Sequence, residues 1–143
     1  MLYFDTSFLV PLILPEPTSD KIAAALKELP VEQFTVSHWT RVEVSSLLAR
    51  EVRVGGLSAV AAAQADMRFE ELVENSFAIL LPNADDFSLA KQYLGRFETG
   101  LRSGDALHLA IARNHGATSI YSLDKTLLKA GAILGLPLST GLV

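Results

Sequence analysis

Four acidic residues, far apart in the sequence, have the local surroundings of a carboxylate site. Asp5 and Asp124 each follow a short apolar run that predicts a buried strand. Glu43 and Asp105 each lie in the first turns of a predicted helix. Ligands of open α/β sheets bind in the crevice beyond the carboxyl ends of the strands. We therefore expect the four acids to converge at one end of a sheet.

Four carboxylates in one place predict bound divalent cations. Mg²⁺ and Mn²⁺ prefer oxygen ligands, and carboxylates are the usual protein donors. Two such ions about 4 Å apart can generate a hydroxide nucleophile and stabilise the leaving oxygen of a phosphodiester. Without cations the carboxylates repel one another and some of their pKa values rise. We therefore expect Mg²⁺ or Mn²⁺, two ions per site when substrate is bound, on Asp5, Glu43, Asp105 and Asp124.

Each acid also has a structural interpretation. Asp124 is a good N-cap for a helix beginning at Lys125. Asp105 is a first-turn acid that the helix dipole favours. Glu43 lies on the more polar side of its predicted helix, where solvent exposure is the ordinary case. Asp5 is different, because a carboxylate that ends a central strand must be paired, hydrogen-bonded, metal-bound or protonated. Asp5 is therefore the strongest candidate for a functional role.

Composition predicts one core-forming domain over residues 1–143. Half of the residues are hydrophobic and a fifth are charged. The chain has no cysteine, which removes disulfides and thiolate metal sites and suits a reducing cytoplasm. No apolar run approaches the roughly 20 residues that span a bilayer. The N-terminal residues have no basic leader, so we expect no signal peptide, no membrane association and a cytoplasmic location.

The net charge of -4 limits the kinds of nucleic-acid binding that fit. A protein that coats nucleic acid by neutralising phosphates should be basic. A cluster of carboxylates lowers the net charge, and bound divalent cations reverse that charge locally. The composition therefore excludes a general nucleic-acid coater and leaves a metal-dependent nuclease open.

Strands and helices are predicted to alternate along the chain. Short apolar segments predict strands at residues 2–5, 33–37, 77–81, 118–122 and 136–139. Longer segments between them predict helices at residues 18–29, 37–54, 57–74, 83–97, 103–115 and 124–134. This alternation predicts an α/β fold, with a mostly parallel central sheet flanked by helices on both faces.

Further residues near the acids have two possible roles. His108 lies one turn after Asp105, and we favour a structural role in a helical stripe with His115. For Trp39 we favour packing in the core over stacking on a base. Basic residues close to the acids either contact phosphates or belong to the solvated surface. The sequence leaves both roles open for Arg41, Arg50, Arg102 and Lys125.

The segments around the four acids together resemble the motifs of PIN-domain nucleases. They are Leu2–Ser7, Thr40–Leu48, Leu101–Ala110 and Tyr121–Asp124. No one motif is specific, but the order and spacing of all four match, and the resemblance runs from Leu2 to the C-terminus. The compact length is similar to that of the VapC toxins of bacterial and archaeal toxin–antitoxin pairs. The resemblance implies a PIN-like three-layer sandwich.

For function, the resemblance implies a magnesium- or manganese-dependent endoribonuclease. Such relatives are usually homodimers held inactive by a cognate antitoxin, and they commonly cleave an exposed loop of transfer or ribosomal RNA. The metal-binding and catalytic roles fall on Asp5, Glu43, Asp105 and Asp124. Hydroxyls that orient carboxylates or metal-bound water fall on Thr6, Ser7 and Ser122.

Two other functions compete with this interpretation. Haloacid dehalogenase-like phosphatases also place a nucleophilic aspartate after the first strand, as Asp5 is placed here. Their motif needs a second aspartate two positions later, and this chain has Ser7 there. The other alternative is a non-catalytic RNA- or protein-binding module on a PIN fold. The presence of all four acids argues against it, because an RNA-binding surface benefits from fewer negative charges.

Overall fold

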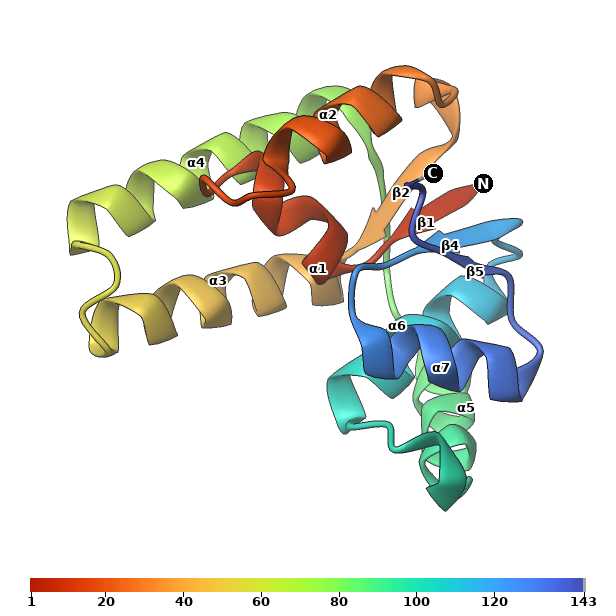
Figure 1. The fold of residues 1–143 in the computed structure, drawn as a ribbon. Coiled ribbons are helices and arrows are strands. Elements are labelled where there is room, and N and C mark those ends of the chain that lie inside the picture. The colour runs from red at the N-terminus through yellow and green to blue at the C-terminus, as the bar shows by residue number, and fades with distance from the viewer. Residues whose placement is uncertain (143) are drawn as a thin grey trace.

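The first strand of the sequence becomes the centre of a five-stranded sheet. The computed structural model describes residues 1–142, and all five strands pair in parallel (Figure 1). Their order across the sheet is β3-β2-β1-β4-β5. The strands are β1 (Leu2–Phe4), β2 (Phe34–Ser37), β3 (Ala78–Leu80), β4 (Ser119–Tyr121) and β5 (Leu138–Ser139). The predicted α/β fold is confirmed.

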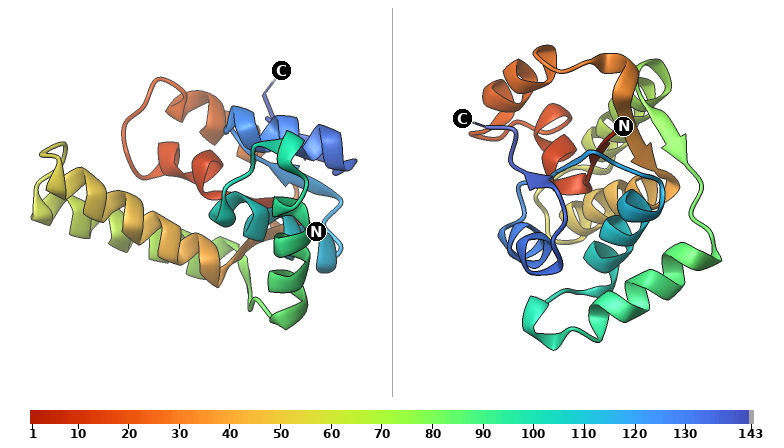
Figure 2. Two further views of the ribbon diagram at one scale, coloured as in Figure 1. Left: turned by 90° about the horizontal axis from the view of Figure 1, so that it is seen from below. Right: turned by 90° about the vertical axis from the view of Figure 1, so that its right-hand side faces the viewer.

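Helices cover both faces of this sheet (Figures 1 and 2). On one side are α1 (Thr6–Leu9), α2 (Ser19–Lys27), α3 (His38–Arg53) and α4 (Ala59–Ser76). On the other side are α5 (Ala84–Leu94), α6 (Ser103–Asn114) and α7 (Lys125–Leu134). Three short 3-10 turns, η1 (Val10–Leu12), η2 (Val31–Gln33) and η3 (Phe97–Thr99), connect them. Across residues 1–142, every helix is too short or too polar to cross a membrane.

Two hydrophobic cores follow from the alternation of side chains along the strands. Phe4 and Tyr121 lie side by side on neighbouring strands and stack with ring centroids 5.0 Å apart. Both belong to the core that α1 to α4 cover. Tyr3 and Ile120 are also neighbours, but they point to the opposite face and pack against α6 and α7. The central strand is therefore buried on both faces, and Asp5 follows it directly.

Two helices are shorter in the structure than the sequence predicts. The helix predicted over residues 83–97 ends at Leu94, because the backbone leaves the helical region at Arg96 and residues 97–99 form the separate turn η3. The helix predicted over residues 18–29 ends at Lys27. Thr18 is its N-cap, but the side chain of Thr18 makes no capping hydrogen bond. Ser19 instead accepts a hydrogen bond from the backbone N–H of Glu16.

One fully buried acid has a structural role that links two helices. Asp86 completes a capping box with Asn83 at the start of α5. Its carboxylate also accepts a hydrogen bond from Asn114 Nδ2, at 2.9 Å, and faces His115 Nε2 at 3.3 Å. Asp86 therefore joins the beginning of α5 to the end of α6.

We expect Asp86→Ala to lower the free energy of unfolding by about 2 kcal/mol, because it removes the contacts by which a buried carboxylate joins the start of α5 to the end of α6. The matched control is Asp85→Ala, which removes the neighbouring, exposed acid and should change stability by less than about 0.5 kcal/mol. Urea unfolding followed by circular dichroism measures both. Equal stabilities of the two variants would contradict the structural role of Asp86.

Candidate active site

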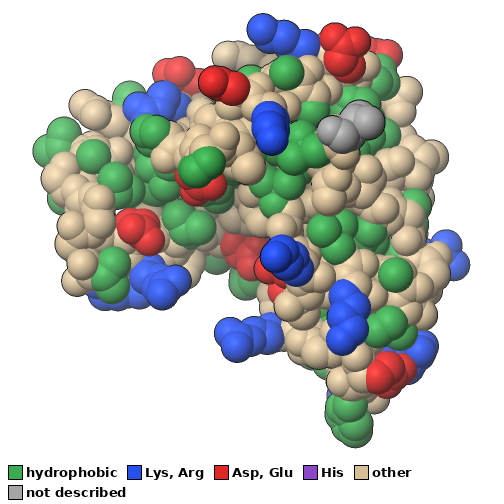
Figure 3. Space-filling model, in the orientation of Figure 1, with side chains coloured by type: hydrophobic (Ala, Val, Ile, Leu, Met, Phe, Trp, Pro, Cys, Tyr) green, Lys and Arg blue, Asp and Glu red, His purple; other side chains and the backbone are tan. Residues whose placement is uncertain are grey.

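The structure brings the four predicted acids to one cavity at the carboxyl ends of β1 and β4. The cavity has a volume of about 350 Å³. Figure 3 shows this face hollowed, with acidic side chains in the hollow and basic side chains beside it. The acids that line the cavity are Asp5, Glu43, Asp105 and Asp124. The other lining residues are Thr6, Ser7, Ser46, Leu47, Arg50 and Arg53.

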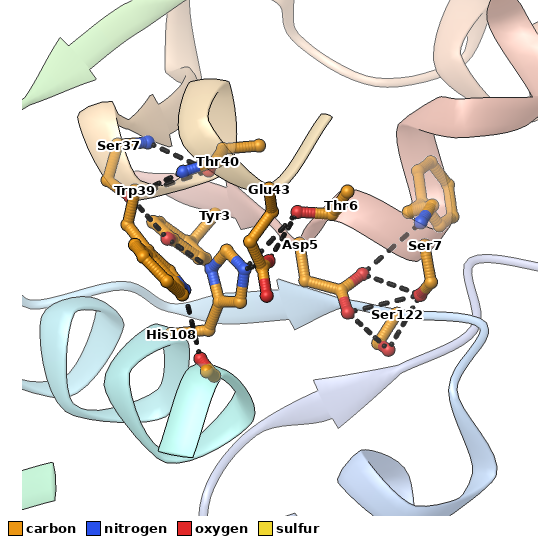
Figure 4. Close-up of polar contacts among 12 residues, drawn as sticks. Tyr3, Asp5, Thr6, Ser7, Ser37, Trp39, Thr40, Glu43, His108 and Ser122 are labelled. Atoms are coloured by element: carbon orange, nitrogen blue, oxygen red, sulfur yellow. Dashed lines mark hydrogen bonds and ion pairs between the residues drawn. The ribbon is translucent and has the colours of Figure 1, made fainter. Parts of the chain in front are cut away.

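Asp5 is held at the end of β1 by hydroxyl and backbone donors. Only 3% of the residue is exposed. Its carboxylate accepts hydrogen bonds from Ser7 Oγ at 2.8 Å, Ser122 Oγ at 3.0 Å and the backbone N–H of Phe8 at 3.2 Å (Figure 4). Burial raises the pKa of Asp5, and His108 together with these donors offsets only part of that effect. Ser7 and Ser122, predicted as supporting hydroxyls, are thus in direct contact with Asp5.

Glu43 reaches the cavity from α3 and is held by two further residues. It is the sixth residue of α3, so it lies in the second turn and not in the first. Its Oε1 accepts hydrogen bonds from Thr6 Oγ1, at 2.6 Å, and from His108 Nε2 (Figure 4). Burial works to raise the pKa of Glu43, but the contacts with His108 and Thr6 lower it overall. Glu43 is therefore an ionised carboxylate at neutral pH.

His108 belongs to this site, which the sequence analysis did not favour. The ring is 1% exposed, and it lies on α6 between Glu43 and Tyr3. Burial lowers the pKa of His108, but Tyr3, Glu43 and Asp5 raise it to about 10. The sequence contained one useful signal, since His108 follows Asp105 by one helical turn on the same side. His115, on the same stripe, instead faces Asp86.

Asp105 carries the negative charge that the protein compensates least. It lies in the first turn of α6, and no hydrogen bond to its carboxylate is found within residues 1–142. Burial and the neighbouring carboxylate of Asp124 raise its pKa to about 6, with smaller contributions from Glu43 and Asp5. The raised pKa therefore reflects burial first and the crowding of the four acids second.

Gly104 allows α6 to approach α3 closely. A Cβ atom at this position would lie 2.7 Å from Oε2 of Glu43 and 3.3 Å from the ring of Trp39. The indole Nε1 of Trp39 also donates a hydrogen bond to the carbonyl oxygen of Gly104, at 3.1 Å. Trp39 is half-buried and packs between the two helices, as the preferred interpretation of this residue predicted.

Asp124 caps a helix and also lines the cavity. Its side chain caps α7 by accepting a hydrogen bond from the backbone N–H of Leu127, at 2.9 Å. It also lines the cavity beside Asp105. The capping contact uses one carboxylate oxygen, Oδ1. A capping role for Asp124 therefore does not remove it from the site.

The donor set fits a divalent cation such as Mg²⁺ or Mn²⁺. Among the described residues, no three Asp, Glu or His side chains are already arranged around one cation position. Protein donors hold Asp5, Glu43 and Asp124, while Asp105 faces them without such a donor. Carboxylates on one cavity are the ligand type that these ions prefer. A cation there would also compensate the charge that raises the pKa of Asp105.

The structure shows which of the basic residues near the acids line the cavity. Arg41 is bound by both carboxylate oxygens of Glu70, away from the cavity. Arg50 lines the cavity, and so does Arg53, which the sequence analysis missed. Both lie on the same helix as Glu43, and the helical repeat places Arg50 on the same stripe. Arg102 and Lys125 are exposed and do not line the cavity.

We expect Asp105→Asn to stabilise the metal-free protein above pH 6. The pKa of Asp105 in the folded protein is about 6, above its value of about 3.9 in an unfolded chain. The folded state therefore holds this proton more tightly, and stability falls as pH rises from about 4 to 6. The variant should lose this dependence. Urea unfolding in EDTA from pH 4 to 8 tests it, and a variant less stable than the parent at pH 8 would contradict the prediction.

Comparison with known proteins agrees with this geometry. The family model of the PIN domain matches residues 2–133. The chain is 34% identical over 142 residues to Ribonuclease VapC35 of Mycobacterium tuberculosis, covering 95% of this chain and 93% of that protein.

Solved structures with the same fold include VapC20 of Mycobacterium tuberculosis, with a TM-score of 0.74 and 20% identity, covering 92% of this chain and 95% of that one. VapBC-1 of nontypeable Haemophilus influenzae has a TM-score of 0.69 and 17% identity, covering 99% and 98%. These likenesses below 25% identity concern the fold, whereas the family match covers most of the sequence. The chain belongs to the PIN-domain family and, within it, is similar to the VapC ribonucleases.

Proposed function

We propose that this chain is a single-domain, metal-dependent endoribonuclease and the toxin of a VapBC-type toxin–antitoxin module. The observation that carries the proposal is the convergence of four acids on one cavity at the carboxyl end of a parallel sheet. Membership of the PIN family and 34% identity to Ribonuclease VapC35 support RNA as the substrate. The reaction is hydrolysis of a phosphodiester bond.

We assign metal binding to the four acids of the cavity, Asp5, Glu43, Asp105 and Asp124. Bound Mg²⁺ or Mn²⁺ supplies a water of lowered pKa and stabilises the leaving oxygen. Ser7 and Ser122 hold the carboxylate of Asp5, and Thr6 holds that of Glu43. Such contacts fix the orientation of metal ligands. In the metal-free protein Asp105 holds a proton below about pH 6, so we expect the cation to bind more weakly there.

The similar proteins support a proposal for the RNA substrate and for the protein partner. VapC20 is described as a toxin that cleaves the sarcin–ricin loop, and we propose a structured RNA loop, of ribosomal or transfer RNA, as the substrate here. Unpaired loops leave their backbone open to a recessed site. Likeness to VapBC-1 supports a cognate antitoxin as a partner, and we propose that this antitoxin covers the acidic cavity. We further propose a homodimer in the cytoplasm.

Asp5→Asn and Asp105→Asn should each lower cleavage roughly 100-fold or more, because each removes a charged ligand of the reacting centre. Asp85→Asn, which neutralises an exposed acid outside the cavity, is the matched control and should cleave like the parent. The assay follows cleavage of a structured RNA with Mg²⁺ or Mn²⁺ and with EDTA, alongside circular dichroism.

Activity that survives in both variants would point to a contaminating nuclease and favour a non-catalytic binding module. The phosphatase alternative makes a different prediction, namely a phosphoaspartate at Asp5. Ser7 stands where that mechanism needs an acid, and its hydroxyl donates to Asp5. RNA products with 5′-phosphate and 3′-hydroxyl ends, without a phosphoenzyme, are expected from direct hydrolysis.

Arg50 and Arg53 are suited to bind phosphates beside the acids. Arg50 follows Glu43 by seven residues, which is about 10 Å along α3. Both arginines are exposed, and no acid among residues 1–142 forms an ion pair with them. An RNA strand whose scissile phosphate lies at the acids therefore passes these guanidinium groups.

We expect Arg50→Ala and Arg53→Ala each to weaken RNA binding and to reduce the slope of log affinity against log salt by about 1. Arg41→Ala is the control, because Arg41 lies on the same helix but is held by Glu70. Fluorescence anisotropy from 50 to 300 mM salt, roughly the range in which this term is large, measures the slopes. An equal change in the control variant would mean that only net charge matters.

A further inference from the structure

Behind Glu43, a chain of buried hydrogen bonds crosses the central strand (Figure 4). It starts at the end of β2, where Ser37 Oγ lies 2.9 Å from the hydroxyl of Tyr3. The same hydroxyl lies 2.7 Å from Nδ1 of His108 on α6. The other ring nitrogen, Nε2, binds Oε1 of Glu43 on α3. Four different elements thus contribute to one network.

The network reaches the cavity at Glu43 and at Thr6, whose Oγ1 lies 3.3 Å from Nε2 of His108. Ser37 and Tyr3 are fully buried, and His108 is 1% exposed. The side chain of Glu43, in contrast, is 25% exposed. Burying polar side chains costs free energy unless every group finds a partner, and among the described residues every buried side-chain polar atom has one. Apolar side chains would fill this space without that requirement, which indicates that the network serves the exposed carboxylate.

Two donors on one oxygen fix the rotation of the carboxylate of Glu43. Oε1 accepts from both His108 and Thr6, so a turn of the carboxylate would break both contacts. Oε2 accepts no hydrogen bond within the described chain and lies beside Gly104. Tyr3 in turn fixes the ring plane of His108 through the opposite nitrogen. Oε2 is therefore presented in one orientation.

We propose that His108, oriented by Tyr3, is a positioning residue that holds Glu43 so that its free oxygen binds the divalent cation. The inference rests on the proposed metal-dependent function. It adds a role that lies outside the four acids and their neighbouring hydroxyls. A partner that orients a metal ligand is commonly worth 10- to 100-fold in metal affinity or activity.

The test compares Tyr3→Phe and His108→Gln with the parent chain in Mn²⁺ binding without RNA, measured by isothermal titration and by electron paramagnetic resonance. We expect Mn²⁺ affinity to fall roughly 10- to 100-fold in both. The kcat for RNA cleavage should fall by a similar factor while KM stays unchanged, because these residues do not contact RNA. His115→Gln is the control, since it removes a histidine–aspartate contact at the C-terminal end of the same helix, outside the cavity.

Variants that fold, bind Mn²⁺ and cleave RNA like the parent would overturn the inference. Tyr3→Phe decides the matter if His108→Gln fails to fold, because it removes one oxygen and keeps the aromatic ring in the core. A loss of Mn²⁺ affinity in His115→Gln of the same size would also overturn it, since the effect would then be general destabilisation. A parent chain that neither binds Mn²⁺ nor cleaves RNA would refute the proposed function itself, and the inference with it.

Discussion

Repulsion among carboxylates at one end of the sheet is the constraint on which the rest of this site depends. Each acid is placed there for a simple structural reason, because it ends a strand, caps a helix or lies in the early turns of one. Hydroxyls, backbone N–H groups and His108 compensate three of them. Asp105 remains without a donor in the described residues, and burial together with the neighbouring acids raises its pKa to about 6. The fold therefore holds a charge arrangement that a divalent cation would complete.

The order of the strands and helices explains how the four acids reach one cavity. The buried strand β1 delivers Asp5, and the neighbouring β4 delivers Ser122 and then Asp124. Helices α3 and α6 bring Glu43 and Asp105 from the two sides, and Gly104 permits their close approach. A buried hydrogen-bond network then links the sheet to the carboxylate of Glu43. The same buried hydrogen bonds therefore join the elements of the fold and orient a carboxylate of the site.

Sequence reasoning predicted the parts of this structure that depend on local pattern. An apolar run ending in Asp5 predicts a buried strand, and alternating strands and helices predict a parallel sheet with acids at its carboxyl end. It did not predict the role of His108, because α6 is apolar around most of its circumference and periodicity does not say which neighbour its ring meets. That contact depends on the approach of α3 to α6, which is a property of the tertiary structure. The early end of α5 at Leu94 also shows that helix boundaries depend on the conformation of single residues, here Arg96, which leaves the helical region.

The most direct test of this account is an NMR titration of the carboxyl groups with and without Mg²⁺. In EDTA, Asp105 should titrate near pH 6. With saturating Mg²⁺, the pKa of Asp105 should fall well below that value, because a bound cation favours the ionised form. The carboxyl resonances of Asp5 and Glu43 should shift at the same Mg²⁺ concentrations. An Asp105 that titrates near its ordinary pKa of about 3.9 in EDTA, or that does not respond to Mg²⁺, would contradict the central claim.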